Sequence, residues 1–197
     1  MTIKTYAPGT LPDEIATKIF RLRYDIFIQE MGYPDPHADK ASNMIEDALD
    51  VTAHHVVVTN EDEIIGLGRI NALKDKNFED MAEIYRLDLL GKDYAQTTAL
   101  STRLMVAPAY RRKRTPMQIC IEQLKIVRSQ NCKWCVICCH PRLVPFFHRL
   151  GFENHTDEID HPNFGVSALL KYNAISPKVS NARTARLLSE KGNPSNP

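Results

Sequence analysis

The sequence predicts an α/β domain. Strand-like stretches, short and rich in β-branched and apolar residues, occur near the start, in the middle and near the end of the chain, and stretches with helical spacing of apolar residues separate them. The length of 197 residues suits one domain with a substantial core. We therefore expect a single domain over residues 1–175 and a mobile, polar tail over residues 176–197.

The charge balance gives no overall field for nucleic acid or an anionic membrane. Lys and Arg (25) nearly equal Asp and Glu (24), which leaves a formal net charge of +1. No apolar run approaches the roughly 20 residues of a membrane span, and the N-terminus lacks the layout of a signal peptide. We expect a cytoplasmic protein that neither spans a membrane nor binds nucleic acid.

The first half of the chain predicts a strand, a long helix, a loop and a hairpin. Residues 3–6 form the strand, and the helix begins after Thr10 as N-cap and runs to about Met31. A second apolar stripe on this helix is aromatic: Phe20, Tyr24 and Phe27. Residues 32–50 have no sustained period and predict a long surface excursion, and residues 51–59 and 64–71 predict a hairpin. Its Gly66 and Gly68 leave room for a ligand or another backbone.

The centre of the chain predicts an anion site. Residues 98–106 read as a strand that ends at Pro108, and residues 116–130 show the spacing of a helix with Thr115 as N-cap. Four basic residues in between, 111–114, therefore lie at a helix N-terminus, whose free N–H groups favour phosphate. The alternative is a solvated basic turn or a localisation signal.

Later elements complete the predicted sheet. The spacing of apolar residues and the turn residues predict five more elements. They are a short helix within residues 72–96, a strand near residues 132–140, a helix over 143–150, a turn at 159–163 and a closing strand over 165–172. Four cysteines lie in or beside the strand near residues 132–140, but Cys135 and Cys138 would point to opposite faces of it. We expect reduced, buried thiols and no metal.

Two motifs together resemble a known superfamily. The strand, basic turn and helix of residues 98–130, followed by Phe146-Phe147-x-x-Leu150-Gly151-Phe152, are similar to the GNAT acyltransferases. The resemblance implies a central mixed sheet flanked by helices on both faces. It also implies that the thioester donor is held by the strand edge and the turn. The implied donor-binding residues are Leu104, Met105, Val106, Arg111, Arg112, Lys113, Arg114, Thr115 and Phe147. Phe147 occupies the position of a tyrosine that often protonates the leaving thiolate in that superfamily.

A narrower resemblance concerns residues 21–152. Their ordered polar and aromatic residues resemble the acyl-homoserine-lactone synthases and the N-acyl amino acid synthases, which implies a polar network around an amine acceptor. The implied acceptor-binding residues are Arg23, Tyr24, Phe27, Tyr33, Arg69 and Arg103, together with Asp47 and Asp50. The alternative is that these charged residues form ordinary ion pairs.

Some positions depart from these families. Ile45 and Leu100 stand where lactone synthases carry glutamates, which argues against homoserine lactone chemistry. Arg114 and Pro116 replace the two glycines of the usual GNAT turn, so tight coenzyme A binding is less expected than binding of a carrier protein with a single phosphate.

The resulting hypothesis is an N-acyltransferase that moves a medium or long acyl group from acyl carrier protein or acyl-CoA to the amine of an amino acid or similar small molecule. The attacking amine must lose a proton, and the candidate bases are Glu46, Asp47, Asp50, Glu83 and His140. The oxyanion is expected at backbone N–H groups near Met105 and Val106. The alternatives are an acetyl-CoA-dependent N-acetyltransferase, a lactone synthase and a non-catalytic acyl or carrier-protein binding module.

Overall fold

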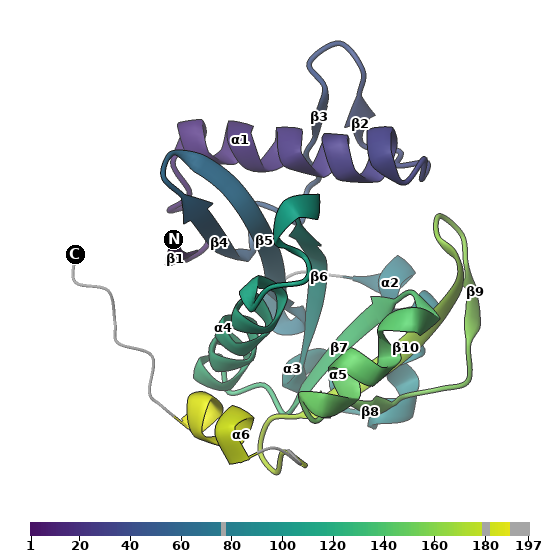
Figure 1. Ribbon diagram of the computed structural model, residues 1–197. Helices are drawn as coiled ribbons and strands as arrows, with labels where there is room; N and C mark the ends of the chain where they lie inside the picture. Colours follow the sequence, from purple (N-terminus) through teal and green to yellow (C-terminus); the bar gives the residue numbers. More distant parts are fainter. Residues whose placement is uncertain (76–77, 179–181, 190–197) are drawn as a thin grey trace.

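The structure is a computed structural model that describes residues 1–75, 78–178 and 182–189. Its centre is a mixed sheet of eight strands in the order β1-β4-β5-β6-β7-β10-β8, with β9 paired to β10 (Figure 1). The strands are β1 (Thr2–Tyr6), β4 (His54–Asn60), β5 (Glu63–Ala72), β6 (Thr98–Val106), β7 (Trp134–Cys139), β8 (Glu153–Asn154), β9 (Ile159–His161) and β10 (Gly165–Asn173). Only β6 and β7 pair in parallel; the other pairs in this sheet are antiparallel. The predicted mixed sheet is confirmed.

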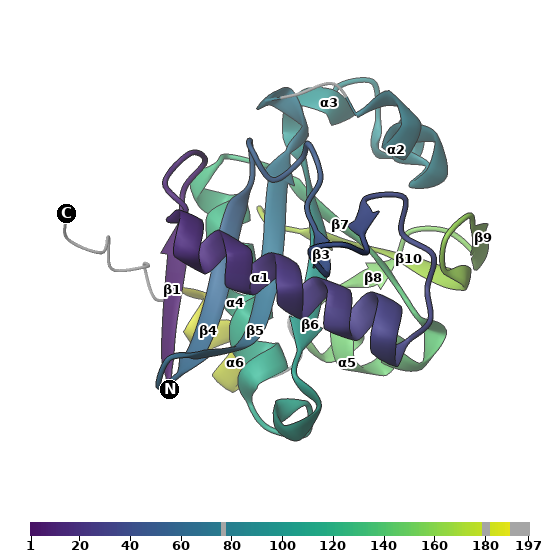
Figure 2. The same ribbon diagram turned by 90° about the horizontal axis from the view of Figure 1, so that it is seen from above.

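Helices cover both faces of this sheet, as predicted. Helix α1 (Asp13–Tyr24) lies on one face, and α4 (Thr115–Ser129) with α5 (Val144–Arg149) on the other (Figures 1 and 2). The alternation of β4 explains the two layers: Val57 packs with Ile19 of α1, whereas Val56 and Val58 pack with Ile119 of α4. A third cluster buries Leu87 and Leu100 against the shorter elements between β5 and β6.

Short elements fill the connections. They are the 3₁₀ helices η2 (Leu73–Asp75), η3 (Leu87–Leu90), η4 (Pro108–Tyr110) and η5 (Pro141–Leu143), and the α-helices α2 (Glu79–Ile84), α3 (Tyr94–Thr97) and α6 (Ala182–Ser189). None of the helices in the described ranges is long and apolar enough to cross a bilayer.

The first helix differs from its predicted form. It starts at Asp13 after Pro12, and the hydroxyl of Thr10 instead donates to the carbonyl of Ala7 over 2.9 Å, so the predicted N-cap was wrong. After Tyr24 the helix continues as a π-helix, η1 (Asp25–Glu30), in which Met31 N–H donates to Ile26 five residues back. The wider turn changes the direction of the side chains that follow, and such segments occur frequently at functional sites.

Two further expectations are corrected. The excursion over residues 32–50 contains a short hairpin, β2 (Ala38–Asp39) with β3 (Met44–Ile45), and residues 159–161 form a strand rather than part of a turn. Of the two interpretations for Gly66 and Gly68, a ligand or another chain segment, the second holds, because a Cβ at Gly68 would meet Gln123 at 2.6 Å and Ile119 at 2.8 Å, both in α4. Both glycines let α4 approach the sheet closely.

The sheet opens between β6 and β7. These strands pair only over Thr98–Ser101 and Trp134–Ile137. Beyond that point β6 has a β-bulge, since Leu67 pairs with Met105 but Arg69 pairs with Thr102, and Arg103 takes a positive φ of 54°. The last residues of β6 therefore have no partner in β7, and their backbone edge faces the opening.

The C-terminal segment is described only in part. Residues 182–189 form α6, which packs on α4 through the buried Leu188, and Arg128 Nη1 donates to the carbonyl of Leu188 over 2.5 Å. Residues 179–181 and 190–197, which belong to the expected mobile tail, lie outside the described residues.

Candidate active site

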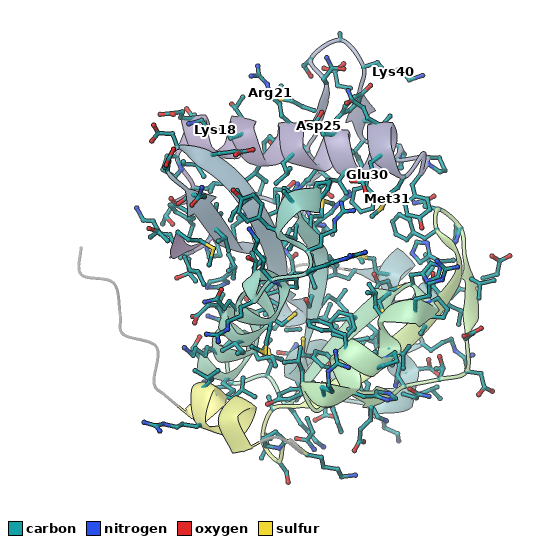
Figure 3. The ribbon with its side chains drawn as sticks, viewed as in Figure 1. Lys18, Arg21, Asp25, Glu30, Met31 and Lys40 are labelled. Atoms are coloured by element: carbon teal, nitrogen blue, oxygen red, sulfur yellow. The ribbon has the colours of Figure 1, made fainter. Side chains whose placement is uncertain are left out.

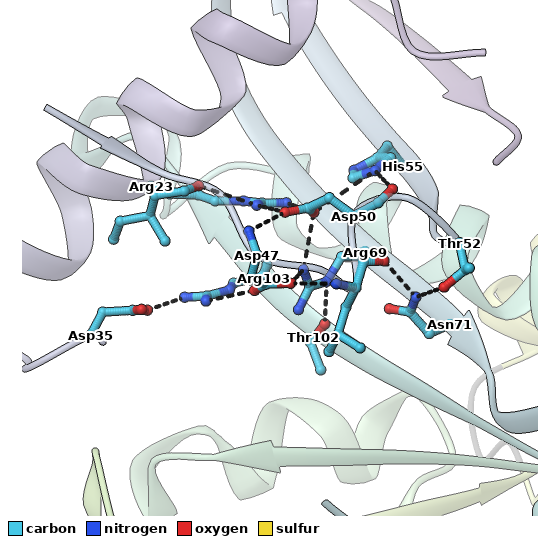
Figure 4. Close-up of polar contacts among 12 residues, drawn as sticks. Arg23, Asp35, Asp47, Asp50, Thr52, His55, Arg69, Asn71, Thr102 and Arg103 are labelled. Atoms are coloured by element: carbon cyan, nitrogen blue, oxygen red, sulfur yellow. Dashed lines mark hydrogen bonds and ion pairs between the residues drawn. The ribbon is translucent and has the colours of Figure 1, made fainter. Parts of the chain in front are cut away.

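A buried polar network joins the first helix, the excursion and the centre of the sheet (Figure 4). Arg23 donates to both carboxylate oxygens of Asp50 over 2.8 and 2.7 Å. Arg69 donates to Asp47 over 2.5 Å, to Asp50 over 3.0 Å and through Nε to the Thr102 hydroxyl over 2.9 Å. The side chains of Arg23, Asp47 and Asp50 are at most 6 % exposed. A guanidinium group that donates hydrogen bonds through two of its nitrogen atoms in this way has little freedom to move.

Arg103 extends this network to the edge of the sheet opening. It donates to Asp35 over 2.6 Å and to Asp47 over 2.9 Å. Its guanidinium carbon also lies 5.1 Å from the ring centroid of Phe27, within the range of a cation–π contact. Three arginines thus meet three aspartates, and the formal charges of these six side chains cancel.

A groove of about 850 Å³ lies beside the network, at the opening between β6 and β7. Its lining combines the end of β6, the basic turn, the start of α4, the π-helix and the α5 region. The lining residues are Ile26, Phe27, Met31, Leu104, Met105, Val106, Arg111, Arg112, Lys113, Arg114, Pro116, Met117, Leu143, Phe146, Phe147, Arg149 and Leu150. This part of the described chain offers five basic side chains and no acidic one, so the groove suits an apolar ligand with an anionic end.

Backbone geometry at Val106 offers a hydrogen-bond donor to this groove. The Val106 carbonyl faces away from β5, since Arg111 Nε donates to it over 2.8 Å, while the N–H of Ala107 donates to Ile65 of β5. A residue's N–H and C=O groups point to the same edge of a strand. The Val106 N–H therefore points to the opening, as an oxyanion site requires.

Comparison with known proteins identifies the family. A family profile described as N-acyl amino acid synthase FeeM matches residues 18–172. The chain belongs to the FeeM N-acyl amino acid synthase family. It is therefore an N-acyltransferase. No curated protein matches the chain.

Solved structures of low sequence identity share the fold. MesI, a CoA-dependent acyl-homoserine lactone synthase, is 18% identical with a TM-score of 0.71, and the match covers 98% of this chain and 97% of MesI. BjaI, of the same description, is 15% identical with a TM-score of 0.74, over 98% and 90% of the two chains. An acyl-CoA N-acyltransferase from Pseudomonas aeruginosa is 13% identical with a TM-score of 0.67, over 87% and 99%. The predicted GNAT fold is confirmed.

The basic turn of this FeeM-family chain is more structured than its sequence indicates. Arg111 pairs with Glu30 through two hydrogen bonds, one of them 2.6 Å long from Nη2. Figure 3 shows Glu30 and Met31 at the end of the first helix, whereas Arg21 and Lys40 point outward. Arg112, Lys113 and Arg114 remain exposed. Arg111 thus ties the turn to the helix, and the other three are available to a ligand.

Helix α4 begins one residue earlier than predicted. Arg114 is the N-cap residue, and the predicted cap Thr115 is the first helical residue, buried and outside the groove lining. The prediction for Thr115 as N-cap was wrong. Arg114 has an ordinary helical φ of −77°, so the turn requires no glycine there.

Of the remaining predicted site residues, some join the site and others lie apart. Tyr33 contacts the ring of Phe27 at a centroid distance of 6.2 Å, but Tyr24 is buried and does not line the groove. Glu46 and Glu83 are exposed. His140 is also exposed, and its Nδ1 accepts from the N–H of Arg142 over 3.1 Å, so it caps η5. None of the five predicted bases lines the groove.

Sequence reasoning missed Asp35 and His55. Asp35 lies in the excursion, where no periodicity marks it, and only the pairing with Arg103 reveals its role. His55 is 2 % exposed in β4, and its Nε2 lies 3.3 Å from the carbonyl oxygen of Asp50, which accepts from it. A histidine pair inside an apolar strand, His54-His55, was the available signal.

The electrostatics of the network favour charged aspartates and a neutral histidine. Burial alone would raise the pKa of Asp47 and of Asp50, but the neighbouring arginines outweigh it and hold both pKa values below their usual range. Burial lowers the pKa of His55 to about 4, against a weaker opposing effect of Asp50. The two carboxylates are therefore poor proton acceptors near neutral pH.

The five cysteines are unpaired thiols. Cys135 packs in the α4 side core and Cys138 in the cluster with Leu100, on opposite faces of β7. Burial raises the pKa of Cys120 to about 12. Over the described ranges, no group of three or more His, Cys, Asp or Glu side chains is arranged to hold a metal ion.

We predict that Asp50→Asn will lower the free energy of unfolding by about 3–5 kcal/mol, because it leaves Arg23 buried without its carboxylate partner. Urea unfolding followed by circular dichroism measures this. Glu46→Gln, four residues away and exposed, is the control and should change stability by less than about 0.5 kcal/mol. Equal stability of the two variants would contradict the structural importance of the network.

We further predict a pH dependence of stability from His55. Its folded pKa of about 4 lies below the ordinary 6.5, so between these values only the unfolded chain binds the proton. Stability should be complete above pH 6.5 and fall by up to about 3 kcal/mol as the pH drops to 4. Urea midpoints of wild type and His55→Gln across this range test it, with the exposed His148→Gln as control. An unchanged slope in His55→Gln would contradict it.

Proposed function

We propose that the chain transfers a medium or long acyl group from the phosphopantetheine thioester of an acyl carrier protein to the amine of an amino acid or similar small molecule, with acyl-CoA as the alternative donor. The observation that carries this is the groove, which brings together the open edge of β6, an apolar lining and a basic rim. A pantetheine arm is a polar chain that can pair with a strand edge, and the acyl group needs apolar surface.

Positive charge at the groove mouth supports an acyl carrier protein as the donor. Arg112, Lys113 and Arg114 are exposed beside one another, and Arg149 adds a fourth cation across the groove. The chain as a whole has a net charge of only +1, so this concentration is local. An acidic partner would be attracted and oriented by it. The solved structures named above that are described as CoA-dependent support coenzyme A as the other source of the same phosphopantetheine chemistry.

The apolar part of the groove supports a long acyl chain. Ile26, Phe27 and Met31 come from the π-helix region, and Leu143 and Phe146 come from the opposite side. Met31 and Leu143 are 45% and 47% exposed, so apolar surface is open at the groove before any ligand binds. Each methylene buried there would contribute ~0.8 kcal/mol.

The reaction needs few groups from the protein. The unprotonated amine attacks the thioester carbonyl, a C–N bond forms, and the oxyanion accepts a hydrogen bond from the Val106 N–H. The C–S bond then breaks, and the proton lost by the amine nitrogen ends on the leaving sulfur. Phe147 cannot deliver this proton, and Asp47 and Asp50 stay ionised, so they position the acceptor side through the arginines. Glu46, Glu83 and His140 could act only through water, given their exposed positions.

Two buried residues weigh against lactone synthesis. Ile45 and Leu100, at the positions of the lactone synthase glutamates, are both 0 % exposed, and Leu100 packs in an apolar cluster with Val136 and Leu169. A carboxylate in the apolar surroundings of Leu100 would be costly. These positions therefore favour an N-acyl amino acid or a similar open-chain amide over an N-acyl-homoserine lactone as the product.

The donor can be tested directly. We predict that kcat/KM rises as the acyl chain lengthens from acetyl towards dodecanoyl, by up to about fourfold per buried methylene, and that carrier-protein donors exceed CoA donors. A panel of both donor types with pooled amino acids, read by mass spectrometry, measures this. A preference for acetyl-CoA would support the N-acetyltransferase alternative, and binding without any transfer would support a non-catalytic module.

The exposed part of the basic turn has its own prediction. Replacing Arg112, Lys113 and Arg114 together by Ala should raise KM for the carrier-protein donor about tenfold and leave the acceptor KM unchanged. Arg111 is kept, because it holds Glu30 and the Val106 carbonyl. Arg21→Ala, an exposed cation on the outer side of α1, is the control. If added salt raises the KM for the carrier-protein donor equally in the variant and the wild type, the basic turn does not bind the donor.

A further inference from the structure

One aromatic ring belongs to both substrate regions. Phe27 lines the groove, and the same ring lies under the guanidinium of Arg103 at 5.1 Å. Its position therefore affects the apolar wall of the donor groove and the network that faces the acceptor. Because Phe27 sits in a π-helical turn, neighbouring turns of a regular helix do not fix its direction. Contacts with residues outside the helix therefore hold this ring in place.

The tip of the β9–β10 hairpin provides that contact. Phe164 stacks on Phe27 with 5.7 Å between ring centroids and 19° between planes, and it also meets Tyr33 at 5.4 Å. Phe164 also stacks on His161, with 4.4 Å between ring centroids. Figure 1 shows this hairpin reaching from the far part of the sheet to the end of the first helix. The contact thus spans the opening between β6 and β7.

Local hydrogen bonds make the hairpin tip rigid. The carbonyl of His161 accepts from the N–H of Phe164 over 3.2 Å, and its Nδ1 accepts from the N–H of Asn163 over 3.1 Å. Gly165, the first residue of β10, pairs with His161 and has a φ of +64°, a left-handed conformation that glycine adopts without steric cost. Phe164 is therefore presented to Phe27 by a preorganised turn and not by a loose loop.

We infer that Phe164 is a positioning residue for acyl transfer, which sets the upper limit of acyl chain length by clamping the Phe27 ring in the groove wall. This inference rests on the proposed function and deepens it. Without the clamp, Phe27 can swing away from the wall, and the groove accepts longer chains. The same swing removes the ring from Arg103, so the clamp also couples the donor groove to the polar network.

A double-mutant cycle tests the clamp. The measured quantity is a ratio of two kcat/KM values, that for a donor four carbons longer than the wild-type optimum divided by that for the optimum itself. In Phe164→Ala this ratio should rise roughly two- to tenfold. Phe27→Ala should produce the same change, and the double variant no more than either single one, because both remove one device. An unchanged ratio in Phe164→Ala, or additive effects of the two substitutions, overturns the inference.

Two controls separate a clamp from general damage. Val166→Ala changes a side chain of the same hairpin that is 59% exposed, and it should leave the ratio unchanged. Phe164→Leu keeps apolar volume but removes the stacked ring, so it should still shift the ratio if Phe164→Ala does not fold. A merely structural role would lower kcat for all donors equally and leave the ratio constant, which overturns the inference.

The test also remains distinct from a test of the proposed function. If the wild type transfers no acyl group to any amine, the proposed function fails. Calorimetry with acyl-CoAs of increasing length then replaces turnover. The chain length that wild type binds most tightly is the optimum, and the dissociation constants of that donor and of one four carbons longer give the ratio. A ratio of dissociation constants that Phe164→Ala does not change overturns the clamp in that case as well.

Discussion

The balance of buried charge at the centre of the domain is the constraint on which the site depends. An arginine stays charged at any accessible pH, so Arg23, Arg69 and Arg103 each need a carboxylate where water is excluded. All three partners come from one segment, the excursion over residues 32–50. This segment has few apolar side chains to bury, and its attachment to the sheet relies on these ion pairs together with the buried Ile45. The network thus places the chain that forms one side of the site.

A single irregularity in β6 serves both halves of this site. The extra residue at Arg103 directs its guanidinium to Asp35 and Asp47, and past the same point β6 no longer pairs with β7. A positive φ at a non-glycine residue costs on the order of 1–3 kcal/mol and persists only where its surroundings enforce it. Two carboxylates and the Phe27 ring provide that enforcement. The exposed backbone edge at the groove is therefore a consequence of how the network holds Arg103.

The success of the sequence predictions follows the range of the interactions involved. Strand alternation and the strand, turn and helix around residues 98–130 are local patterns, and they predicted the individual strands and helices. Their arrangement in a mixed sheet with helices on both faces came from the family resemblance. The assembly of Arg23, Asp47, Asp50, Arg69 and Arg103 came from ordered family resemblance, since no local spacing brings these residues together. Asp35 and Phe164 lie in loops whose contacts are made only in the folded chain. The aromatic stripe of the first helix was predicted with a period of 3.6, and the π-helix broke that period before Phe27.

The same charge balance limits what the network can do in catalysis. Carboxylates held by arginines are stable as anions, so in the proposed reaction they would fix geometry rather than move protons. A thioester needs little more, because a thiolate leaves readily and the main barrier is bringing an unprotonated amine to the carbonyl in the correct orientation. An active site of this kind gains from rigidity more than from a tuned base. The ion pairs, the β6 bulge and the stacked rings of Phe27 and Phe164 all provide rigidity at the place where the two substrates would meet.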